Sequence, residues 1–246
     1  MIDKKIVIIT GCNGQLGRSL TENLINESFF VFGIDLEIEK SYFKTFKNFK
    51  PFILDITKPN AIQTFFQDIA EYKDNVFGLV NNAGVAVFTP FNKRTIDDLN
   101  KVINVNMIGT ILMTQEFMSF TSIEKNIRVI NLGSIYGEVA PDLSVYGDTP
   151  RMSSEIYGMT KAAIINFTKY LTQFFKDRDA NFNCVSPGGI EFNQGKEFKR
   201  LYSKRVPLGR MADVIEIANV ISFLLKDESS YINGENIFID GGLTKW

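Results

Sequence analysis

The sequence predicts an α/β fold with three layers, a doubly wound and mostly parallel sheet of seven strands with helices on both faces. Short β-branched runs alternate with longer amphipathic stretches over nearly all of the 246 residues. The strand candidates are apolar throughout, which is typical of parallel strands that are covered on both sides. A glycine-rich turn, 11–17, joins the first strand candidate to the first helix candidate. Together these observations favour right-handed crossovers and a ligand crevice at the carboxyl ends of the strands.

Each expected strand is a short apolar run, and each expected helix is a longer stretch with apolar residues at helical spacing. Strands are expected at 4–10, 29–35, 51–54, 76–80, 126–132, 180–186 and 236–239. Helices are expected at 15–27, 59–71, 94–120 with a break near Asn104, 154–176, 195–204 and 213–225. Residues 135–153 and 187–210 are irregular, and long loops of this kind often cover an active site. With no repeat or linker, residues 1–246 are expected to form one domain.

The composition excludes several classes of protein. The chain is 45% hydrophobic and 22% charged with a net charge of -1, which argues against nucleic-acid and membrane-surface partners. No apolar stretch reaches the roughly 20 residues of a membrane helix, and the N-terminus lacks a signal-peptide pattern. Cys12 and Cys184 have neither metal-ligand nor redox spacing, so a cytoplasmic location is expected.

The chain contains no histidine. This absence excludes histidine-based triads, histidine general bases and most zinc sites, and we expect no metal. Proton chemistry near neutral pH must therefore use tyrosine, lysine, cysteine or a carboxylate with a shifted pKa.

The glycine turn and the acidic residue after the second strand candidate predict a dinucleotide site. Gly11, Gly14 and Gly17 let the backbone approach a diphosphate at the start of a helix. Asp35 would accept hydrogen bonds from the adenosine ribose. A carboxylate repels a 2′-phosphate, and no Lys or Arg follows in Leu36-Glu37, so NAD is favoured over NADP.

A second group of residues predicts proton chemistry in the same crevice. Tyr157 and Lys161 are four residues apart in a helix candidate, so their side chains share one face. An ammonium beside a phenol lowers the phenol pKa from its usual value of about 10. Ser134 and the segment Asn81-Asn82-Ala83-Gly84 each follow a strand candidate, at the edge of the sheet where the glycine turn lies.

Over essentially its whole length the chain resembles the short-chain dehydrogenases/reductases, in their compact single-domain branch with a Rossmann-type sheet. The resemblance depends on many short motifs in the same order. They are Thr10-Gly11 with Gly14 and Gly17, Asp35, Asp55-Ile56-Thr57, Asn81-Asn82-Ala83-Gly84, Asn104-Val105-Asn106, Gly133-Ser134, Tyr157-Gly158-Met159-Thr160-Lys161, Pro187-Gly188 and Ile239-Asp240-Gly241-Gly242.

The resemblance implies a catalytic set of Ser134, Tyr157, Lys161 and Asn106. Tyr157 would exchange a proton with the substrate, and Lys161 would lower the pKa of Tyr157 and hold the nicotinamide ribose. Ser134 would bind the substrate oxygen, and Asn106 would complete a water-mediated proton relay to Lys161. The implied cofactor contacts are Gly11, Asn13, Gly14, Gln15, Leu16, Gly17, Asp35, Asp55, Ile56, Asn82, Ala83, Gly84, Tyr157, Lys161, Pro187, Gly188 and Ile190. For Asn82 and Asn106 the alternative is a side chain that caps the backbone at a turn or helix break.

The chain departs from the family in three respects. The glycine spacing is closer to that of the longer sugar-nucleotide-modifying branch. Between Ser134 and Tyr157 lie 22 residues, against roughly a dozen usually, so an added lid over the substrate is expected. Phe192 occupies a position where the compact branch commonly has a threonine that contacts the nicotinamide amide.

The predicted reaction is the interconversion of a secondary alcohol and a ketone, with a sugar-derived substrate. Ser134-Ile135-Tyr136-Gly137, with Ala140-Pro141-Asp142 and Tyr146, is similar to reductases of bacterial surface-glycan and flagellin-sugar pathways. A cluster of cations in 191–210 would attract a phosphorylated or other anionic substrate, or would form an ordinary solvated helix face. These cations are Lys196, Lys199, Arg200, Lys204, Arg205 and Arg210. The alternatives are a sugar epimerase or dehydratase that recycles bound NAD, and a non-catalytic dinucleotide sensor.

The helix expected at 154–176 is apolar over more of its circumference than one core-facing stripe requires. Either the helix is wholly internal or it packs against a second subunit. We favour the second reading, and expect a homodimer or homotetramer formed through this helix.

Overall fold

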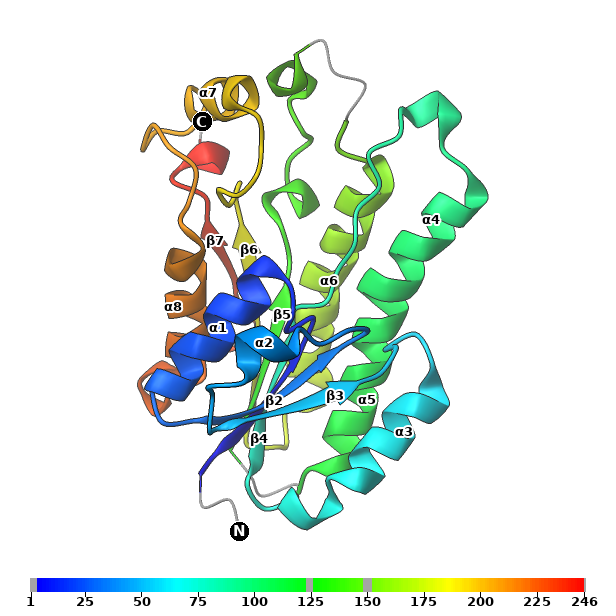
Figure 1. Ribbon diagram of the computed structural model, residues 1–246, viewed down its shortest axis with the longest axis vertical. Helices are drawn as coiled ribbons and strands as arrows, with labels where there is room; N and C mark the ends of the chain where they lie inside the picture. The colour runs from blue at the N-terminus through cyan, green and yellow to red at the C-terminus, as the bar shows by residue number, and fades with distance from the viewer. Residues whose placement is uncertain (1–3, 123–125, 148–151, 246) are drawn as a thin grey trace.

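The computed structural model describes residues 4–122, 126–147 and 152–245, which form a seven-stranded sheet with helices on both faces (Figure 1). All neighbouring strands pair in parallel, and their order across the sheet is β3-β2-β1-β4-β5-β6-β7. The strands are β1 (Ile6–Thr10), β2 (Phe30–Asp35), β3 (Phe49–Ile53), β4 (Val76–Asn81), β5 (Ile127–Leu132), β6 (Ala180–Pro187) and β7 (Asn236–Ile239). The predicted fold class is confirmed.

The helices fall close to the predicted ranges. They are α1 (Gln15–Asn26), α2 (Lys40–Phe43), α3 (Pro59–Asp68), α4 (Ile96–Ile103), α5 (Thr110–Phe120), α6 (Glu155–Phe174), α7 (Lys196–Ser203) and α8 (Val214–Leu224). The sequence did not predict α2, because four residues are too few to show helical spacing and Phe43 alone is buried among them.

Two apolar cores lie on opposite faces of the sheet. The strands β1 to β6 contribute to both because successive side chains point to opposite sides, whereas β7 contributes only to the core under α1 and α8. In β1, Ile6 and Ile8 pack into the core under α3, α5 and α6, whereas Val7 and Ile9 pack into the core under α1 and α8. All five residues of β1 are buried. The uninterrupted apolar run in the sequence is therefore explained by cover on both faces.

The region between α4 and α5 differs from the prediction. Instead of a break near Asn104, the segment Asn104–Gly109 continues as a π-helix that joins the two α-helices. Single π-helical turns inside longer helices are frequent at functional sites. In the described part of the chain, no helix is both long and apolar enough to span a bilayer.

The strand order sets the position of the crevice. β1 has β2 on one side and β4 on the other, so the chain leaves the middle of the sheet in opposite directions. Where the connections after two neighbouring strands lead in opposite directions, a crevice forms at the carboxyl ends of those strands. Open α/β sheets bind their ligands in this crevice.

Candidate active site

A cavity of about 470 Å³ lies at the carboxyl ends of β1, β2 and β4, where the sequence placed the dinucleotide. Eleven of the predicted cofactor contacts line this cavity: Gly11, Asn13, Gly14, Gln15, Leu16, Asp35, Asp55, Ile56, Asn82, Ala83 and Gly84. The sequence reasoning missed five apolar wall residues, namely Ile34, Leu36, Leu54, Val85 and Val105. They lie at strand ends and in a helical segment, where an apolar residue gives no sign of a ligand.

Gly17 does not line the cavity, and the structure gives it a different role. A Cβ atom on Gly17 would lie 2.2 Å from the carbonyl oxygen of Gly11, so a side chain would force α1 away from the turn. The absence of a side chain lets α1 begin against the turn. Gly14 is the N-cap of α1, and no side chain of the described residues caps it. The free N–H groups of this first turn suit a phosphate.

The turn after β1 is fixed to the segment after β4 by side-chain hydrogen bonds. Asn82 Nδ2 donates to the carbonyl oxygens of Thr10 at 3.0 Å and Gly11 at 2.9 Å. Thr10 Oγ1 accepts from the backbone N–H groups of Asn82 and Ala83, both at 3.1 Å. The side chain of Asn82 therefore caps the backbone at a turn, which was the predicted alternative to a cofactor contact. Asn82 also lies on the cavity wall.

Asp35 lies at the end of β2 with both carboxylate oxygens held by backbone amides. Oδ2 accepts from the Asn13 N–H and Oδ1 from the Leu36 N–H, each at 2.8 Å. Arg18 lies nearby, donating to the Asn13 carbonyl oxygen at 2.8 Å and pairing with Glu39 at 2.5 Å. The sequence reasoning looked for a cation only directly after Asp35 and missed Arg18, which the fold brings close from α1.

A second cavity of about 380 Å³ adjoins the first, and three of the four predicted catalytic residues line it. Leu16, Asn82, Gly84 and Val85 line both cavities. Six predicted residues line the second cavity: Ser134, Tyr157, Lys161, Pro187, Gly188 and Ile190. Asn106 lines neither of the two cavities. The predicted dinucleotide contacts and the other three predicted catalytic residues therefore lie in adjoining cavities.

Three side chains converge in this second cavity from β5 and α6. Ser134 lies beside the phenol of Tyr157 and acts to lower the pKa of that phenol. Lys161 Nζ donates to the carbonyl oxygen of Leu132 at 2.6 Å and lies 5.6 Å from the centroid of the Tyr157 ring. Ser154 caps α6 by accepting from the Tyr157 N–H at 3.3 Å, which fixes the first turn of the helix.

The pKa of Tyr157 differs from the expectation. Burial raises the pKa of this phenol, and the hydrogen bond from Ser134 opposes the rise without cancelling it. Lys161 does not lower the pKa of Tyr157 as predicted, because its amine donates to the Leu132 carbonyl oxygen and is itself desolvated. Burial lowers the pKa of Lys161 to about 8.

Asn106 lies in the π-helical segment, and its side-chain amide is fully engaged. Oδ1 accepts from the Val85 N–H at 2.8 Å, and Nδ2 donates to the Val85 carbonyl oxygen at 3.0 Å and to Thr160 Oγ1 at 3.2 Å. A Cβ atom on Gly84 would lie 3.5 Å from Asn106 Oδ1 and 3.6 Å from Lys161 Nζ. Asn106 therefore holds the segment after β4 beside Lys161, and its part in a proton relay stays a prediction.

The predicted lid contains two 3-10 helices, Ile135–Gly137 and Leu143–Tyr146, and its residues 148–151 lie outside the described part of the chain. The lid contacts α7. The rings of Tyr146 and Phe198 have centroids 5.3 Å apart, and Arg205 forms an ion pair with Asp142. The lid lines the second cavity, and α7 lines a smaller cavity beside it.

Four of the six cations predicted to form a basic mouth are paired with carboxylates. The pairs are Lys199 with Glu191, Arg200 with Glu197, Arg205 with Asp142 and Arg210 with Glu216. Of the described residues that line the second cavity, Lys161 alone bears a charge. This arrangement favours the alternative reading, a solvated helix face.

Phe192 also lies away from the crevice. Its side chain is 57% exposed and it is absent from the described linings of both cavities. Gln15 Nε2 instead ties the glycine turn to this segment, by donating to the Glu191 carbonyl oxygen at 2.6 Å.

The residues present fit a nicotinamide dinucleotide. The free N–H groups at the start of α1 suit its diphosphate, Asp35 suits a ribose with free hydroxyls, and a cavity extends from both to the Ser134–Tyr157 pair. When bound, such a cofactor gives or takes a hydride. The two hydroxyls beside it can hold and protonate a carbonyl oxygen.

Comparisons with known proteins agree with this geometry. A family model described as enoyl-(acyl carrier protein) reductase matches residues 37–244. A 3-oxoacyl-[acyl-carrier-protein] reductase of Aquifex aeolicus is 30% identical over 242 residues, which cover 96% of this chain and 86% of that protein. The post-translational flagellin modification protein A of Campylobacter coli is 26% identical over 257 residues, covering 98% of this chain and 99% of that protein.

Among solved structures, a short-chain dehydrogenase of Leptospira borgpetersenii with bound NAD+ is 37% identical and superposes with a TM-score of 0.92. The match covers 98% of this chain and 93% of that one. Because the family model and these relatives span nearly the whole chain, the protein belongs to the short-chain dehydrogenase/reductase family of NAD(P)-dependent oxidoreductases acting on CH–OH and C=O groups.

Proposed function

We propose that this protein uses NAD(H) to interconvert a secondary alcohol and a ketone on a small, sugar-derived molecule, with Ser134, Tyr157, Lys161 and Asn106 as its catalytic set. One observation carries the proposal. Ser134 and Tyr157 lie together on the wall of a cavity that adjoins the cavity at the glycine turn. A substrate oxygen between the two hydroxyls accepts a hydrogen bond from each.

In the reductive direction the carbonyl carbon would receive the hydride that a bound nicotinamide supplies. Ser134 holds the oxygen and stabilises the charge that develops on it. Tyr157 gives that oxygen its phenolic proton, and the raised pKa keeps the phenol protonated until the oxygen becomes basic enough to take it. Lys161, with a pKa of about 8, is able to return a proton toward Tyr157 near neutral pH. Asn106 keeps the segment after β4 beside Lys161.

The preference for NAD(H) rests on the charges at the end of β2. Asp35 would repel a 2′-phosphate, and Arg18, which could pair with one, is already paired with Glu39. The 37% identical Leptospira borgpetersenii structure carries NAD+, which supports this preference.

The comparisons with relatives support a sugar-derived substrate less strongly than they support NAD(H). One relative is named as a flagellin modification protein, whereas others are named as 3-oxoacyl-[acyl-carrier-protein] reductases. A reductase of 3-oxoacyl thioesters is therefore the second candidate.

The test compares Tyr157→Phe with Tyr170→Phe, a matched change at an exposed tyrosine of the same helix. Oxidation of NADH and NADPH is followed with ketoses, sugar phosphates, nucleotide sugars and an acetoacetyl thioester. We expect turnover with NADH in preference to NADPH. We expect Tyr157→Phe to lower kcat at least about 100-fold, the usual effect of losing a general acid, without changing the Kd for NADH. Tyr170→Phe should match the wild type.

Three results would count against the proposal. Retained turnover in Tyr157→Phe would remove the proton donor. Conversion of a sugar without net oxidation or reduction of NAD(H) would indicate an epimerase or dehydratase. Binding of NADH with no reaction on any of these carbonyl compounds would favour a dinucleotide sensor.

A further inference from the structure

Aromatic side chains cover the Ser134–Tyr157 pair in a way that proton transfer does not require. A cavity of about 150 Å³ adjoins the second cavity, and Tyr136 and Tyr146 line both. Its wall includes residues of the lid, of α6, of the segment after β6 and of α7, together with Met211. A substrate that extends from Tyr157 into this cavity contacts these rings.

The side chains of Tyr136 and Tyr146 lie beside the reacting phenol. Tyr146 is 9% exposed. Both tyrosines, together with Tyr157, line the second cavity. Burial raises the pKa of Tyr136, and the neighbouring phenols Tyr146, Tyr202 and Tyr157 add to that rise. The hydroxyl of Tyr136 therefore remains protonated and acts as a neutral donor and acceptor.

The positions of the two phenols are fixed by packing. Gly158, next to Tyr157 in α6, has no side chain because a Cβ there would lie 2.7 Å from the carbonyl oxygen of Tyr136. The 3-10 turn that carries Tyr136 thus rests directly on the catalytic helix. On the other side, the Tyr146 ring packs on Phe198 of α7. Groups held in this way bind a ligand without a large ordering cost.

The charge of the site limits the ligand further. Of the described residues around these two cavities, Lys161 alone is charged, and its amine donates to the Leu132 carbonyl oxygen. Three nearby cations, Arg205, Lys199 and Arg200, are paired with carboxylates outside both cavities, and Lys196 of α7 lines neither cavity. Apart from Lys161, no described residue that lines these cavities offers a cation to an anionic group.

We propose that Tyr136 and Tyr146 form a hydroxyl-binding subsite, which selects an uncharged ketone that carries a hydroxyl on the carbon next to its carbonyl. This inference rests on the proposed reduction at Tyr157, because the carbonyl must lie at that phenol. An adjacent hydroxyl then reaches the neighbouring phenols. It accepts a hydrogen bond from one phenol and donates one to the other, so the ligand hydroxyl is paired on both sides.

Matched pairs of small ketones test the subsite: acetoin against 2-butanone, and 2-hydroxycyclohexanone against cyclohexanone. For each pair the ratio of kcat/KM values is measured with NADH. We expect the wild type to prefer the hydroxyketone about tenfold or more, the size of one or two net hydrogen bonds. Tyr136→Phe and Tyr146→Phe should bring the ratio close to one. Tyr231→Phe, at a fully exposed tyrosine, should leave the ratio unchanged.

The proposed subsite is contradicted if the wild-type ratio of kcat/KM values is near one. It is also contradicted if neither phenylalanine variant lowers that ratio. A higher kcat/KM for dihydroxyacetone phosphate than for dihydroxyacetone would overturn the neutral-ligand assignment.

Binding measurements separate this inference from the proposed reaction. The affinities of each pair for the Tyr157→Phe protein saturated with NADH are measured by the change in NADH fluorescence, where turnover is not needed. A preference for the hydroxyketone that disappears in Tyr157→Phe/Tyr146→Phe supports the subsite, whatever the kinetics show. Equal affinities, or no binding of either ketone, would overturn it. Full turnover in Tyr157→Phe would instead overturn the proposed reaction and leave the subsite to be judged by these ratios.

Discussion

The amine of Lys161 is a charged group in a nearly dry environment. The residue is 5% exposed, and Nζ has the Leu132 carbonyl oxygen as its hydrogen-bond acceptor at 2.6 Å. Burial lowers its pKa to about 8 from the usual 10.5. Between these two pH values the unfolded chain holds more protons than the folded protein, so stability rises with pH across this window. Below pH 8 the folded protein carries the full cost of the buried ammonium.

This pKa predicts a pH-dependent difference between the wild type and Lys161→Met. Urea unfolding at pH 7.5 and 9.5 should show the wild type gaining about 1–2 kcal/mol relative to the variant, since the shift spans roughly two pH units. Lys169→Met, at an exposed position of the same helix, provides the control and should show no such gain. If the free energies of unfolding of the wild type and Lys161→Met differ by the same amount at both pH values, the pKa of Lys161 lies near its ordinary value.

At the residue scale, the sequence predicted those site residues whose position follows from a strand end or a helix turn. Ser134 follows β5, and Tyr157 and Lys161 are one turn apart, so their convergence could be foreseen. The pKa of Tyr157 could not be foreseen, because it depends on burial that only the folded lid and α6 create. Tyr136 and Tyr146 appeared only as part of a lid motif, since their meeting depends on the path of that lid.

At the scale of elements, an ion pair joins the loop before α4 to the start of α6. Arg94 pairs with Glu155, the first residue of α6, and also donates to the Thr89 carbonyl oxygen. The Arg94 side chain is 3% exposed, whereas that of Glu155 is 36% exposed. The Met152 N–H donates to the Phe88 carbonyl oxygen at 3.2 Å and joins the same two segments. These contacts set where the first turn of α6, with Tyr157, meets the loop that lines the second cavity.

Breaking this pair should cost both stability and activity. Glu155→Gln leaves the buried guanidinium without its counter-charge, and we expect a loss of about 3 kcal/mol or less, because Glu155 is partly exposed. The kcat should fall because the first turn of α6 loses an anchor. Glu197→Gln breaks a pair whose side chains are both more than half exposed and should cost less than about 1 kcal/mol. Urea unfolding and kcat are measured for both variants, and equal losses would show that burial of Arg94 has no effect.

Most elements could be predicted because their apolar pattern is uninterrupted, as in β1 and β4, where every residue is buried. The elements that could not be predicted lack such a pattern. The short α2 has one buried residue, and the π-helical Asn104–Gly109 differs from an α-helix only in its hydrogen bonds. The sequence predicted a break near Asn104, whereas in the fold the π-helix carries Asn106, whose side chain bonds Val85 and Thr160.

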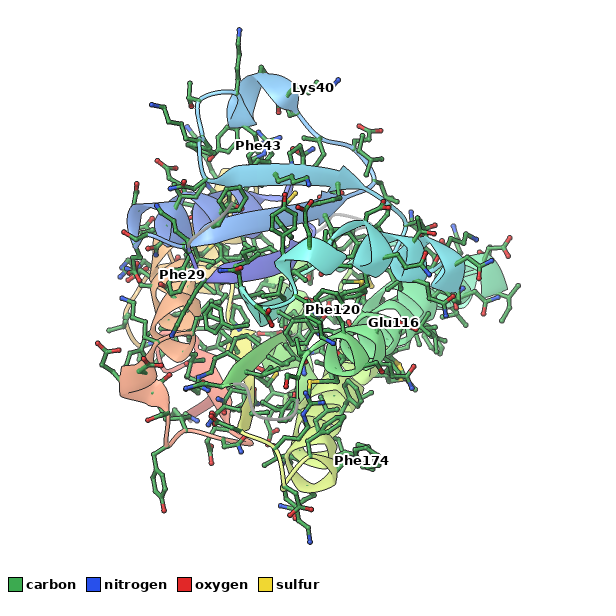
Figure 2. The ribbon with its side chains drawn as sticks, turned by 90° about the horizontal axis from the view of Figure 1, so that it is seen from below. Phe29, Lys40, Phe43, Glu116, Phe120 and Phe174 are labelled. Carbon is green, nitrogen blue, oxygen red and sulfur yellow. The ribbon has the colours of Figure 1, made fainter. Side chains whose placement is uncertain are left out.

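At the scale of the whole molecule, the outer face of α6 remains apolar after the sheet is covered. Met159, Tyr170 and Phe174 are 64%, 57% and 64% exposed, and the rings of Tyr170 and Phe174 stack with centroids 5.6 Å apart. Figure 2 shows Phe174 on the outer side of the helix. The inner face of α6 packs on the sheet with residues such as Ile164 and Leu171. Part of the apolar surplus seen in the sequence, namely Tyr170 and Phe174, therefore lies on the surface, and a subunit contact through this face stays a prediction.

An apolar helix face of this kind is stabilised when a second copy covers it, so we predict a homodimer or homotetramer formed through α6. The mass in solution, measured by size-exclusion chromatography with light scattering over a range of concentrations, should be two or four times 27.9 kDa. Phe174→Lys places a charge in the centre of the contact and should shift the mass toward that of one chain. Tyr231→Lys changes a fully exposed aromatic residue outside α6 and should leave the mass unchanged. A monomeric wild type, or an oligomer that Phe174→Lys does not weaken, would mean that the exposed rings of α6 are not the subunit contact.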